Sequence, residues 1–406
     1  MAGLPKKERS VKRPDISVIS VLFPLSVVHL VSHVHVMAVP ALLPLLPEAL
    51  NVNYVELGVA IGVFNVASTL SQVPMGFAVD RFGGRRLLYL ALTVGSGGYL
   101  LLALFPTYLC LLLAMVLAGM ANGVYHPADY SILSRSIRDS HMGRAFSVHS
   151  FAGYCGSALT PAIMIGLASF YGISWALVAA GLFGVIAFCV LAASAVDKQA
   201  PKPAERPAEE KKGSLGLSFL SPTIILLIVF FVLLNLSTAS IERFSVSALI
   251  QGYGVELAQA NTALTAFLFC SAFGVLGGGF LADRIRRHGY VTVLAFAVAA
   301  ALVAVVAMSR LHPVALVTLF AVIGFLTGVI VPSRDMLVRA AAPKGSEGKV
   351  FGIAFTGFNI GGTFGPVLFG LFLDHLLPSM VFWSTVLFML LTVILTWVQE
   401  SRIKRQ

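Results

Sequence analysis

The chain has 406 residues, of which 58% are hydrophobic and only 11% are charged. Because soluble domains carry about 25% charged residues, this composition excludes a soluble globular protein and indicates an integral membrane protein. The formal net charge of +10 does not indicate nucleic-acid binding, because the basic residues lie in short segments between long apolar ones. We therefore expect the lipid bilayer, and no nucleic acid, among the partners of the chain.

Apolar segments of roughly 20 residues or more, long enough to cross a bilayer as helices, recur along the whole chain. The first group of six lies near 16–46, 54–79, 87–105, 108–133, 145–170 and 173–196. The second group of six lies near 219–250, 257–282, 290–309, 312–333, 349–373 and 380–398. The sequence thus predicts an all-α membrane protein of twelve transmembrane helices in two six-helix bundles.

The basic residues predict the orientation of these helices. Of the 28 lysines and arginines, 26 fall on one side of the predicted bundle, and the exceptions are Arg243 and Arg310. Short loops rich in lysine and arginine stay in the cytoplasm, so we expect both termini there and a multi-pass protein of the cell inner membrane. The expected organisation is a tail at 1–15, a bundle at 16–196, a linker at 197–217, a bundle at 218–398 and a tail at 399–406.

The loop between the second and third predicted helices occurs again in the second half of the chain. It reads GFAVDRFGGRR at 76–86, and a related GFLADRIRRHG occupies 279–289. Since charged side chains are costly in hydrocarbon, both copies are predicted to be turns that face water. Identical residues also recur 205 positions apart elsewhere, for example from Pro127 to Pro332. An internal repeat of this kind is a signature of secondary transporters.

The repeated loop resembles the cytoplasmic motif between helices 2 and 3 of the major facilitator superfamily, Gly-x-Leu-Ala-Asp-Arg-x-Gly-Arg-Arg. The first copy matches it at Gly76, Asp80, Arg81 and Gly83, and the second at Gly279, Leu281, Ala282, Asp283 and Arg284. The resemblance implies the major facilitator fold, in which helices 1, 4, 7 and 10 line a central cavity. We expect a conformational gating role for the loop residues Asp80, Arg81, Arg85, Asp283 and Arg284.

Three histidines lie in the first predicted helix. His29 and His33 are four residues apart and share a helix face, whereas His35 points elsewhere. Polar groups inside a membrane usually face an interior or an aqueous cavity, so substrate or proton binding is one interpretation of His29 and His33. A structural role is the other interpretation, and for His35 it is the preferred one. Metal binding by the pair ranks lower, because no cysteine or carboxylate has the spacing to complete such a site.

The fourth predicted helix contains Asn122, His126 and Asp129 at spacings of four and three residues, so they share a face. Pro127 should kink the helix beside them. Because histidine titrates near physiological pH, we expect His126 and Asp129 to couple transport to protons, with Asn122 contributing to substrate binding. The alternative is that Asp129 pairs with Arg135 near the cytoplasm.

The His126–Pro127 pair followed by Asp129 resembles the His-Pro-Glu/Asp segment of the fosmidomycin-resistance branch of the superfamily. That resemblance implies drug efflux. Drug/proton antiporters usually carry an arginine where this chain has Met115, so the resemblance does not extend to an arginine-centred proton relay. Glycines of the eleventh predicted helix resemble an antiporter motif that normally belongs to helix 5, and close helix packing explains them equally well.

The second half supplies further polar residues within its predicted helices. Arg243 is the candidate anion-binding residue, because a charge retained in a membrane span must be paired or used. Its neighbour Glu242, together with Arg334 and Asp335 of the tenth helix, is expected to form gates. Asn235 and Asn359 complete the expected substrate-binding set, which also includes His29, His33 and Asn122.

The sequence therefore predicts a monomeric secondary transporter that needs no cofactor and is driven by an ion gradient, with protons favoured. The leading interpretation is antiport that exports a small, preferably anionic, drug or metabolite and confers antibiotic resistance. Proton-coupled uptake of a small organic acid is the alternative. A third interpretation is an intramembrane metal-dependent enzyme built on His29, His33 and His126, although no HExxH or other hydrolase motif supports it.

Overall fold

A computed structural model of the chain describes residues 18–137, 139–194, 196, 222–285, 287–341 and 347–403. The predicted N-terminal tail and the linker at 197–217 lie outside the described residues. Twelve membrane-spanning helices are found in the described part, which confirms the predicted all-α architecture. A helix suits a membrane span because it satisfies its own backbone hydrogen bonds in lipid.

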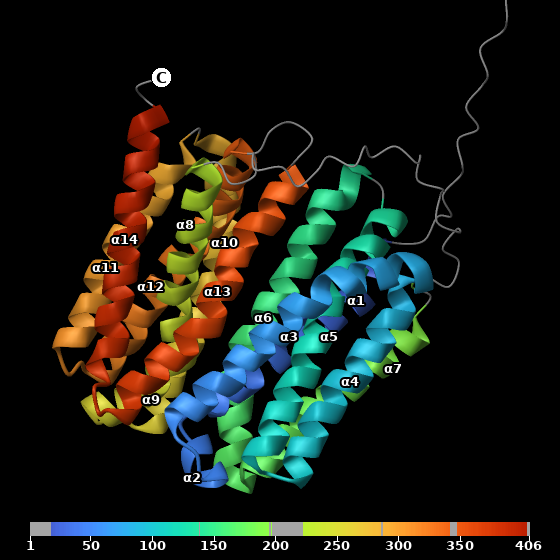
Figure 1. The fold of residues 1–406 in the computed structure, drawn as a ribbon, viewed down its shortest axis with the longest axis horizontal. Coiled ribbons are helices and arrows are strands. Elements are labelled where there is room, and N and C mark those ends of the chain that lie inside the picture. The colour runs from blue at the N-terminus through green and yellow to red at the C-terminus, as the bar shows by residue number, and fades with distance from the viewer. Residues whose placement is uncertain are drawn as a thin grey trace, which may run out of the picture.

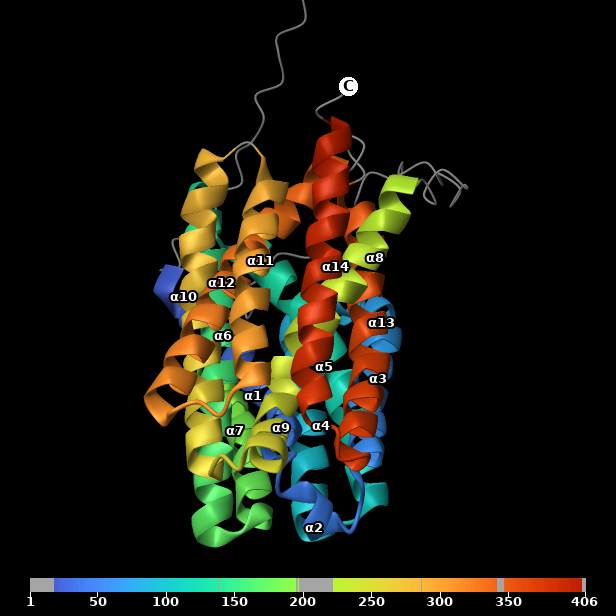
Figure 2. The same ribbon diagram turned by 90° about the vertical axis from the view of Figure 1, so that its left-hand side faces the viewer.

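The first bundle contains α1 (Val18–Leu42), α3 (Tyr54–Phe82), α4 (Gly84–Leu104), α5 (Tyr108–Ser136), α6 (Asp139–Tyr171) and α7 (Ile173–Ala193), with the short α2 (Leu46–Leu50) after α1. The second bundle contains α8 (Pro222–Ala239), η2 (Ser240–Phe244), α9 (Ser245–Tyr253), α10 (Leu257–Arg284), α11 (His288–Met308), α12 (Pro313–Ala341), α13 (Glu347–Asp374) and α14 (Ser379–Ile403). The two bundles lie side by side (Figure 1), and the view turned by 90° has the second bundle in front (Figure 2).

The apolar pattern of the seventh span predicts one continuous α-helix, but the structure shows an interrupted one. It consists of α8, one π-helical turn at η2 and then α9. A π-turn carries one extra residue, so it rotates the side chains that follow it, and such turns are frequent at functional sites. Here the turn contains Glu242 and Arg243.

The two bundles meet along α3 and α13, which pack so closely that their backbones are in contact. Small residues make this possible, because a Cβ atom added at Gly62 would lie 2.9 Å from the carbonyl oxygen of Thr363. The same holds at Gly58, which faces Pro366, and at Gly370, which faces Tyr54. The contact ends near Asn65, whose side chain donates a 2.8 Å hydrogen bond to the carbonyl of Gly362.

The outer end of this contact is closed by Asp374, the last residue of α13. Its two carboxylate oxygens each accept a 2.8 Å hydrogen bond, from the backbone amides of Tyr54 and Val55. These amides belong to the first turn of α3 and have no partner within their own helix. The positive end of the α3 dipole therefore attracts a carboxylate from the opposite bundle, which ties the bundles together at this end.

At the other end of the molecule, α3 and α13 diverge (Figure 1). The side chains of Phe77 in α3 and Phe280 in α10 are each 73% exposed, and nothing lies within 4 Å of a Cβ added at Gly76. This end carries the repeated Asp-Arg loops, which the distribution of basic residues assigns to the cytoplasm. The structure is therefore open toward the predicted cytoplasmic side and closed at the opposite side.

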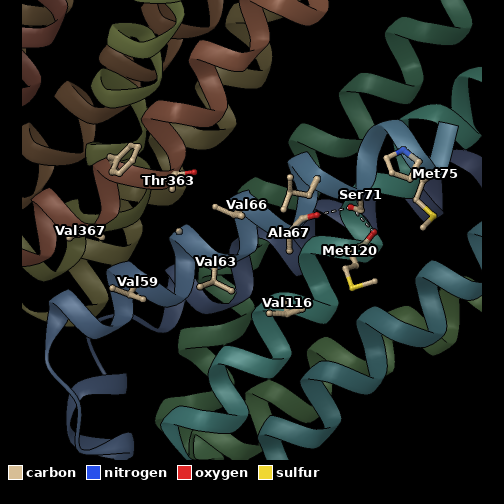
Figure 3. Close-up of a pocket in the computed structure, with 14 residues that line it drawn as sticks. Val59, Val63, Val66, Ala67, Ser71, Met75, Val116, Met120, Thr363 and Val367 are labelled. Carbon is tan, nitrogen blue, oxygen red and sulfur yellow. Dashed lines mark hydrogen bonds between the residues drawn. The ribbon is translucent and has the colours of Figure 1, made fainter. Parts of the chain in front are cut away.

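A cavity of about 690 Å³ lies where α3 leaves α13, between α3, α5 and α13 (Figure 3). Its lining is almost entirely apolar, and its hydroxyl groups bond to their own helices: Ser71 Oγ donates to Ala67 O and Thr363 Oγ1 to Asn359 O. Since no hydrogen-bonding group is free in its lining, this cavity does not suit a polar substrate.

We predict that Asp374→Asn shifts the protein toward the conformation that is closed on the cytoplasmic side. Loss of the charge at the α3 N-terminus should remove about 1 kcal/mol of attraction, roughly a fivefold change in population. Electron–electron distance measurements between spin labels at positions 77 and 280, in a background without native cysteines, should report shorter distances. Glu48→Gln, which removes an exposed carboxylate in α2, is the matched control, and equal distance distributions in both variants would contradict the role of Asp374.

Candidate functional site

A buried carboxylate lies between two imidazoles in the first bundle. Asp129 of α5 retains only 1% of its side-chain accessibility. His29 Nδ1 of α1 lies 3.5 Å from Asp129 Oδ2, and His149 Nε2 of α6 lies 3.3 Å from the same oxygen. We call His29, Asp129 and His149 the central group.

Glycines of α6 allow α1 to approach closely enough to form this group. A Cβ atom at Gly153 would lie 2.7 Å from His29 Cδ2 and 2.8 Å from His33 Cδ2, and Gly156 faces the backbone of Leu30. Small residues at membrane helix interfaces permit such backbone approach. Any residue larger than glycine at position 153 would therefore clash with the imidazoles of α1.

Two further histidines connect the central group with less buried surroundings. The ring of His29 stacks on His149 at a centroid distance of 4.0 Å, and it lies 4.8 Å from the ring of His33 and 5.4 Å from that of His126. His33 and His126 are half-buried, whereas His29 and His149 are buried. His126 in turn faces the exposed ring of Tyr130. The imidazoles thus form a continuous path from the carboxylate to the exposed ring of Tyr130.

The contacts of Asp129 are not conventional hydrogen bonds. Neither of its oxygens nor His29 Nδ1 has a hydrogen-bond partner among the described residues, although all three atoms are buried. A buried carboxylate without compensation is costly, whereas a positively charged imidazole at this distance stabilises it. The imidazoles of His29 and His149 are therefore the groups placed to compensate the charge of Asp129.

The central group could also hold a metal ion. One donor atom from each of His29, Asp129 and His149 lies within 4.8 Å of the other two. Imidazole and carboxylate donors suit zinc and related divalent ions. This set differs from the predicted combination of His29, His33 and His126, because Asp129 and His149 take the places of His33 and His126.

His126 and Asp129, which were predicted to act together, do not contact each other directly in the structure. Asp129 points to α1 and α6, and its neighbours are His29 and His149, not His126. Asn122, on the predicted common face, donates a 2.8 Å hydrogen bond to Ser68 of α3. The alternative pairing of Asp129 with Arg135 is not formed, because Arg135 Nη2 lies 3.9 Å from Asp80.

His149 is the site residue that the sequence analysis missed. The signal available for it was a lone histidine in an apolar span, four residues before Gly153 on the same helix face. His35, by contrast, packs as expected for a structural histidine. Its Nε2 lies 3.0 Å from the carbonyl oxygen of Ala180 in α7, and its own carbonyl accepts a hydrogen bond from Tyr99.

In the second bundle, Arg243 and Glu242 are half-buried within the π-turn. Arg243 Nη1 is enclosed and has no hydrogen-bond partner among the described residues, and no ion pair joins Arg243 to Glu242 there. Asn235 is buried against Gly361, with its Oδ1 also without a partner in the described part. Asn359 is half-buried, and its backbone carbonyl accepts a hydrogen bond from Thr363.

The predicted gating residues have local contacts. Arg85 donates hydrogen bonds to the carbonyls of Leu191, Ala192, Ser194 and Val196, so it caps the C-terminus of α7. Arg81 lies over the ring of its neighbour Phe82, and Arg284 is exposed at the end of α10. The side chain of Asp283 lies outside the described residues.

Arg334 and Asp335 of α12 contact each other directly. Arg334 Nε donates a 2.9 Å hydrogen bond to Asp335 Oδ1. The guanidinium carbon also lies 5.5 Å from the ring centres of both Phe231 in α8 and Phe355 in α13. Arg334 thus joins three helices of the second bundle.

The model of the Major Facilitator Superfamily matches residues 25–245 and 233–406, which together include nearly all of the described helices. The chain belongs to the Major Facilitator Superfamily. It is accordingly a transporter of small molecules across a membrane and not an enzyme, which removes the metal-dependent enzyme from the three interpretations of the sequence.

Relatives within the Major Facilitator Superfamily include resistance proteins and anion transporters. The chain is 27% identical over 399 residues to the fosmidomycin resistance protein of Escherichia coli, covering 95% of this chain and 94% of the relative. It is 25% identical over 362 residues to probable anion transporter 5 of Arabidopsis thaliana, covering 80% and 81%. The predicted resemblance to the superfamily and to the fosmidomycin-resistance branch is confirmed.

A solved structure of the same superfamily fold is a bacterial homologue of the human lysosomal transporter Spinster, in an inward-facing and unoccupied conformation. It superimposes with a TM-score of 0.79 at 14% identity, covering 95% of this chain and 97% of that chain. This similarity confirms the fold of the two bundles together.

We predict that Gly153→Ala destabilises the protein and Gly166→Ala does not. Both glycines lie in α6, but a Cβ at Gly153 meets the rings of His29 and His33, whereas nothing lies within 4 Å of one at Gly166. Overpacking typically costs about 1–3 kcal/mol, while alanine in an unobstructed helix position gains up to about 1 kcal/mol. Thermal unfolding of the purified variants should show a lower midpoint for Gly153→Ala alone. Equal midpoints would mean that α1 and α6 are not packed as described.

Proposed function

We propose that the protein is a proton-driven transporter of a small organic anion, and that export of a drug or metabolite is its physiological direction. The observation that carries this proposal is the enclosure of the Asp129 carboxylate by His29 and His149, with the half-buried His33 and His126 beside them. A titratable group this deep in a membrane protein is expensive to retain unless it functions.

In this proposal, the central group binds and releases one proton in each cycle. With the proton bound, the carboxylate and an imidazolium neutralise each other inside the bundle. Without it, the carboxylate carries an uncompensated buried charge, which costs several kcal/mol unless the surroundings rearrange. That difference is the driving force by which protonation biases one conformation over the other.

The two conformations interconvert by movement of one bundle against the other about the α3–α13 contact. Asp374 holds the outer side closed in the present conformation, and Asp80, Arg81 and the second-half Asp283 and Arg284 are proposed to close the cytoplasmic side in the other. Arg85 contributes indirectly, because it anchors the start of α4 to the end of α7. Glu242 and Arg243 are proposed to belong to the outer gate and outer part of the substrate site.

The proposed substrate surface includes His33, Asn122, Asn235, Arg243 and Asn359, which lie on helices of both bundles. The name of the plant anion transporter supports an anionic substrate, and that of the fosmidomycin resistance protein supports export. We propose that the protein works as a monomer in the cell inner membrane, confers antibiotic resistance by antiport with protons, and requires no cofactor.

Uptake by symport is the second candidate, and the electrostatics of the site favour it for an anion. A proton bound to the central group adds positive charge within the first bundle, which strengthens rather than weakens the attraction of an anion bound nearby. A proton and an anion that bind together travel in the same direction. Proteoliposomes loaded with fosmidomycin or benzoate separate the candidates: antiport gives efflux when the outside is acid, whereas symport requires an acid interior.

We predict that Asp129→Asn abolishes transport driven by a pH gradient but retains exchange of substrate between the two sides. Exchange needs no net proton movement, whereas accumulation against a gradient requires the proton site. Counterflow and pH-driven accumulation should be measured on the same proteoliposomes, with Glu48→Gln as a control that removes a carboxylate outside the membrane core. Undiminished accumulation by Asp129→Asn would place the proton site elsewhere.

A further inference from the structure

A cationic side chain of the second bundle, Arg334, has donor groups available for a ligand. The guanidinium carbon of Arg334 lies 5.5 Å from the ring centres of both Phe231 and Phe355, and its Nε is bonded to Asp335. The two ring centres are 5.0 Å apart, so both rings pack against the guanidinium from the same side. The N–H groups that point away from the rings and from Asp335 are the remaining donors.

Those remaining donors have no partner in the part of the chain that the structure describes. Neither Nη1 nor Nη2 of Arg334 donates a hydrogen bond to any described residue, while the side chain retains 12% of its accessibility. Arginine differs from lysine in presenting two parallel N–H groups that match a carboxylate, phosphate or phosphonate. Arg243 is the weaker candidate for such contact, because its Nη1 is enclosed by protein.

The internal repeat makes Arg334 the counterpart of Asp129. Residues of α5 recur 205 positions later in α12, so that Pro127 corresponds to Pro332 and Asp129 corresponds to Arg334. The two halves thus carry opposite charges at equivalent positions of α5 and α12.

Tyr154 of α6 connects the two charged regions. Its ring lies 6.4 Å from that of His33, and its hydroxyl is within range of the charges of Arg334 and Asp335. A small molecule between Arg334 and Tyr154 would therefore contact both bundles and lie beside the histidine path.

We propose that Arg334 binds the carboxylate, phosphate or phosphonate group of the substrate through its two Nη atoms, with Asp335 as its positioning residue. Phe231 and Phe355 pack against the guanidinium from one side and limit its movement. This inference rests on the proposed anionic substrate, and it moves Arg334 from a predicted gating role to substrate recognition.

Binding of simple anions to the purified protein tests this assignment. Full-length protein without a histidine tag, in lipid nanodiscs, is titrated calorimetrically with benzoate, phenylphosphonate and the neutral benzamide. We expect the two anions to bind and benzamide to bind at least tenfold more weakly. Arg334→Gln should weaken anion binding at least tenfold, and Arg334→Lys should restore it only in part because lysine lacks the planar fork.

Arg310→Gln is the matched control, since Arg310 is exposed and also lies outside the cytoplasmic clusters. Its anion affinity should equal that of the wild type. If Arg334→Gln does not fold, the comparison of Arg334→Lys with the wild type remains decisive. Anion binding that is absent from the wild type, matched by benzamide, or unchanged in the Arg334 variants would overturn the proposal.

The same variants separate this inference from the proposed function. If proton coupling fails, Asp129→Asn will transport like the wild type, while anion binding will still depend on Arg334. If the Arg334 site fails, pH-driven transport will still be lost in Asp129→Asn, while anion affinity will be insensitive to Arg334.

Discussion

The buried Asp129 carboxylate is the constraint on which the arrangement of the first bundle depends. A charge in this position is tolerated only with opposite charge close by, and the structure supplies imidazoles from α1 and α6. Bringing them there requires Gly153 and Gly156 on α6, because larger residues would push α1 away. The glycine pattern, the histidine pair of α1 and the lone histidine of α6 are therefore parts of one feature.

The second bundle uses the same helical framework for different chemistry. Where α5 has Asp129, α12 has Arg334, and the surroundings change accordingly from imidazoles to phenyl rings. Duplication preserved the glycines and prolines that set helix contacts and bends, while the charged residues between them diverged. In the proposed mechanism the first half binds the proton and the second half binds the anion. The helices α3 and α13 join the two halves at the closed end.

Composition and periodicity predicted the twelve helices and their division into two bundles, because membrane spans are determined by local hydrophobicity. The repeated loop and His126–Pro127 were sufficient for the family. The partners of Asp129 were not predictable, since neither the spacing on α5 nor any local rule indicates which face of α1 or α6 it meets. His149 and the cap formed by Asp374 were missed for the same reason, because each contact joins side chains of one helix to a different helix. His149 of α6 meets Asp129 of α5, and Asp374 meets Tyr54 at a separation of 320 positions in the other bundle.

Proton binding by the central group is the central claim, and charge displacement after a pH jump tests it most directly. Proteoliposomes adsorbed on a solid-supported membrane, without substrate, would be switched between neutral and acid buffer while the transient current is recorded. We expect the wild type to give a transient that is absent from Asp129→Asn and reduced in His149→Gln. A transient of wild-type size in Asp129→Asn would contradict the account.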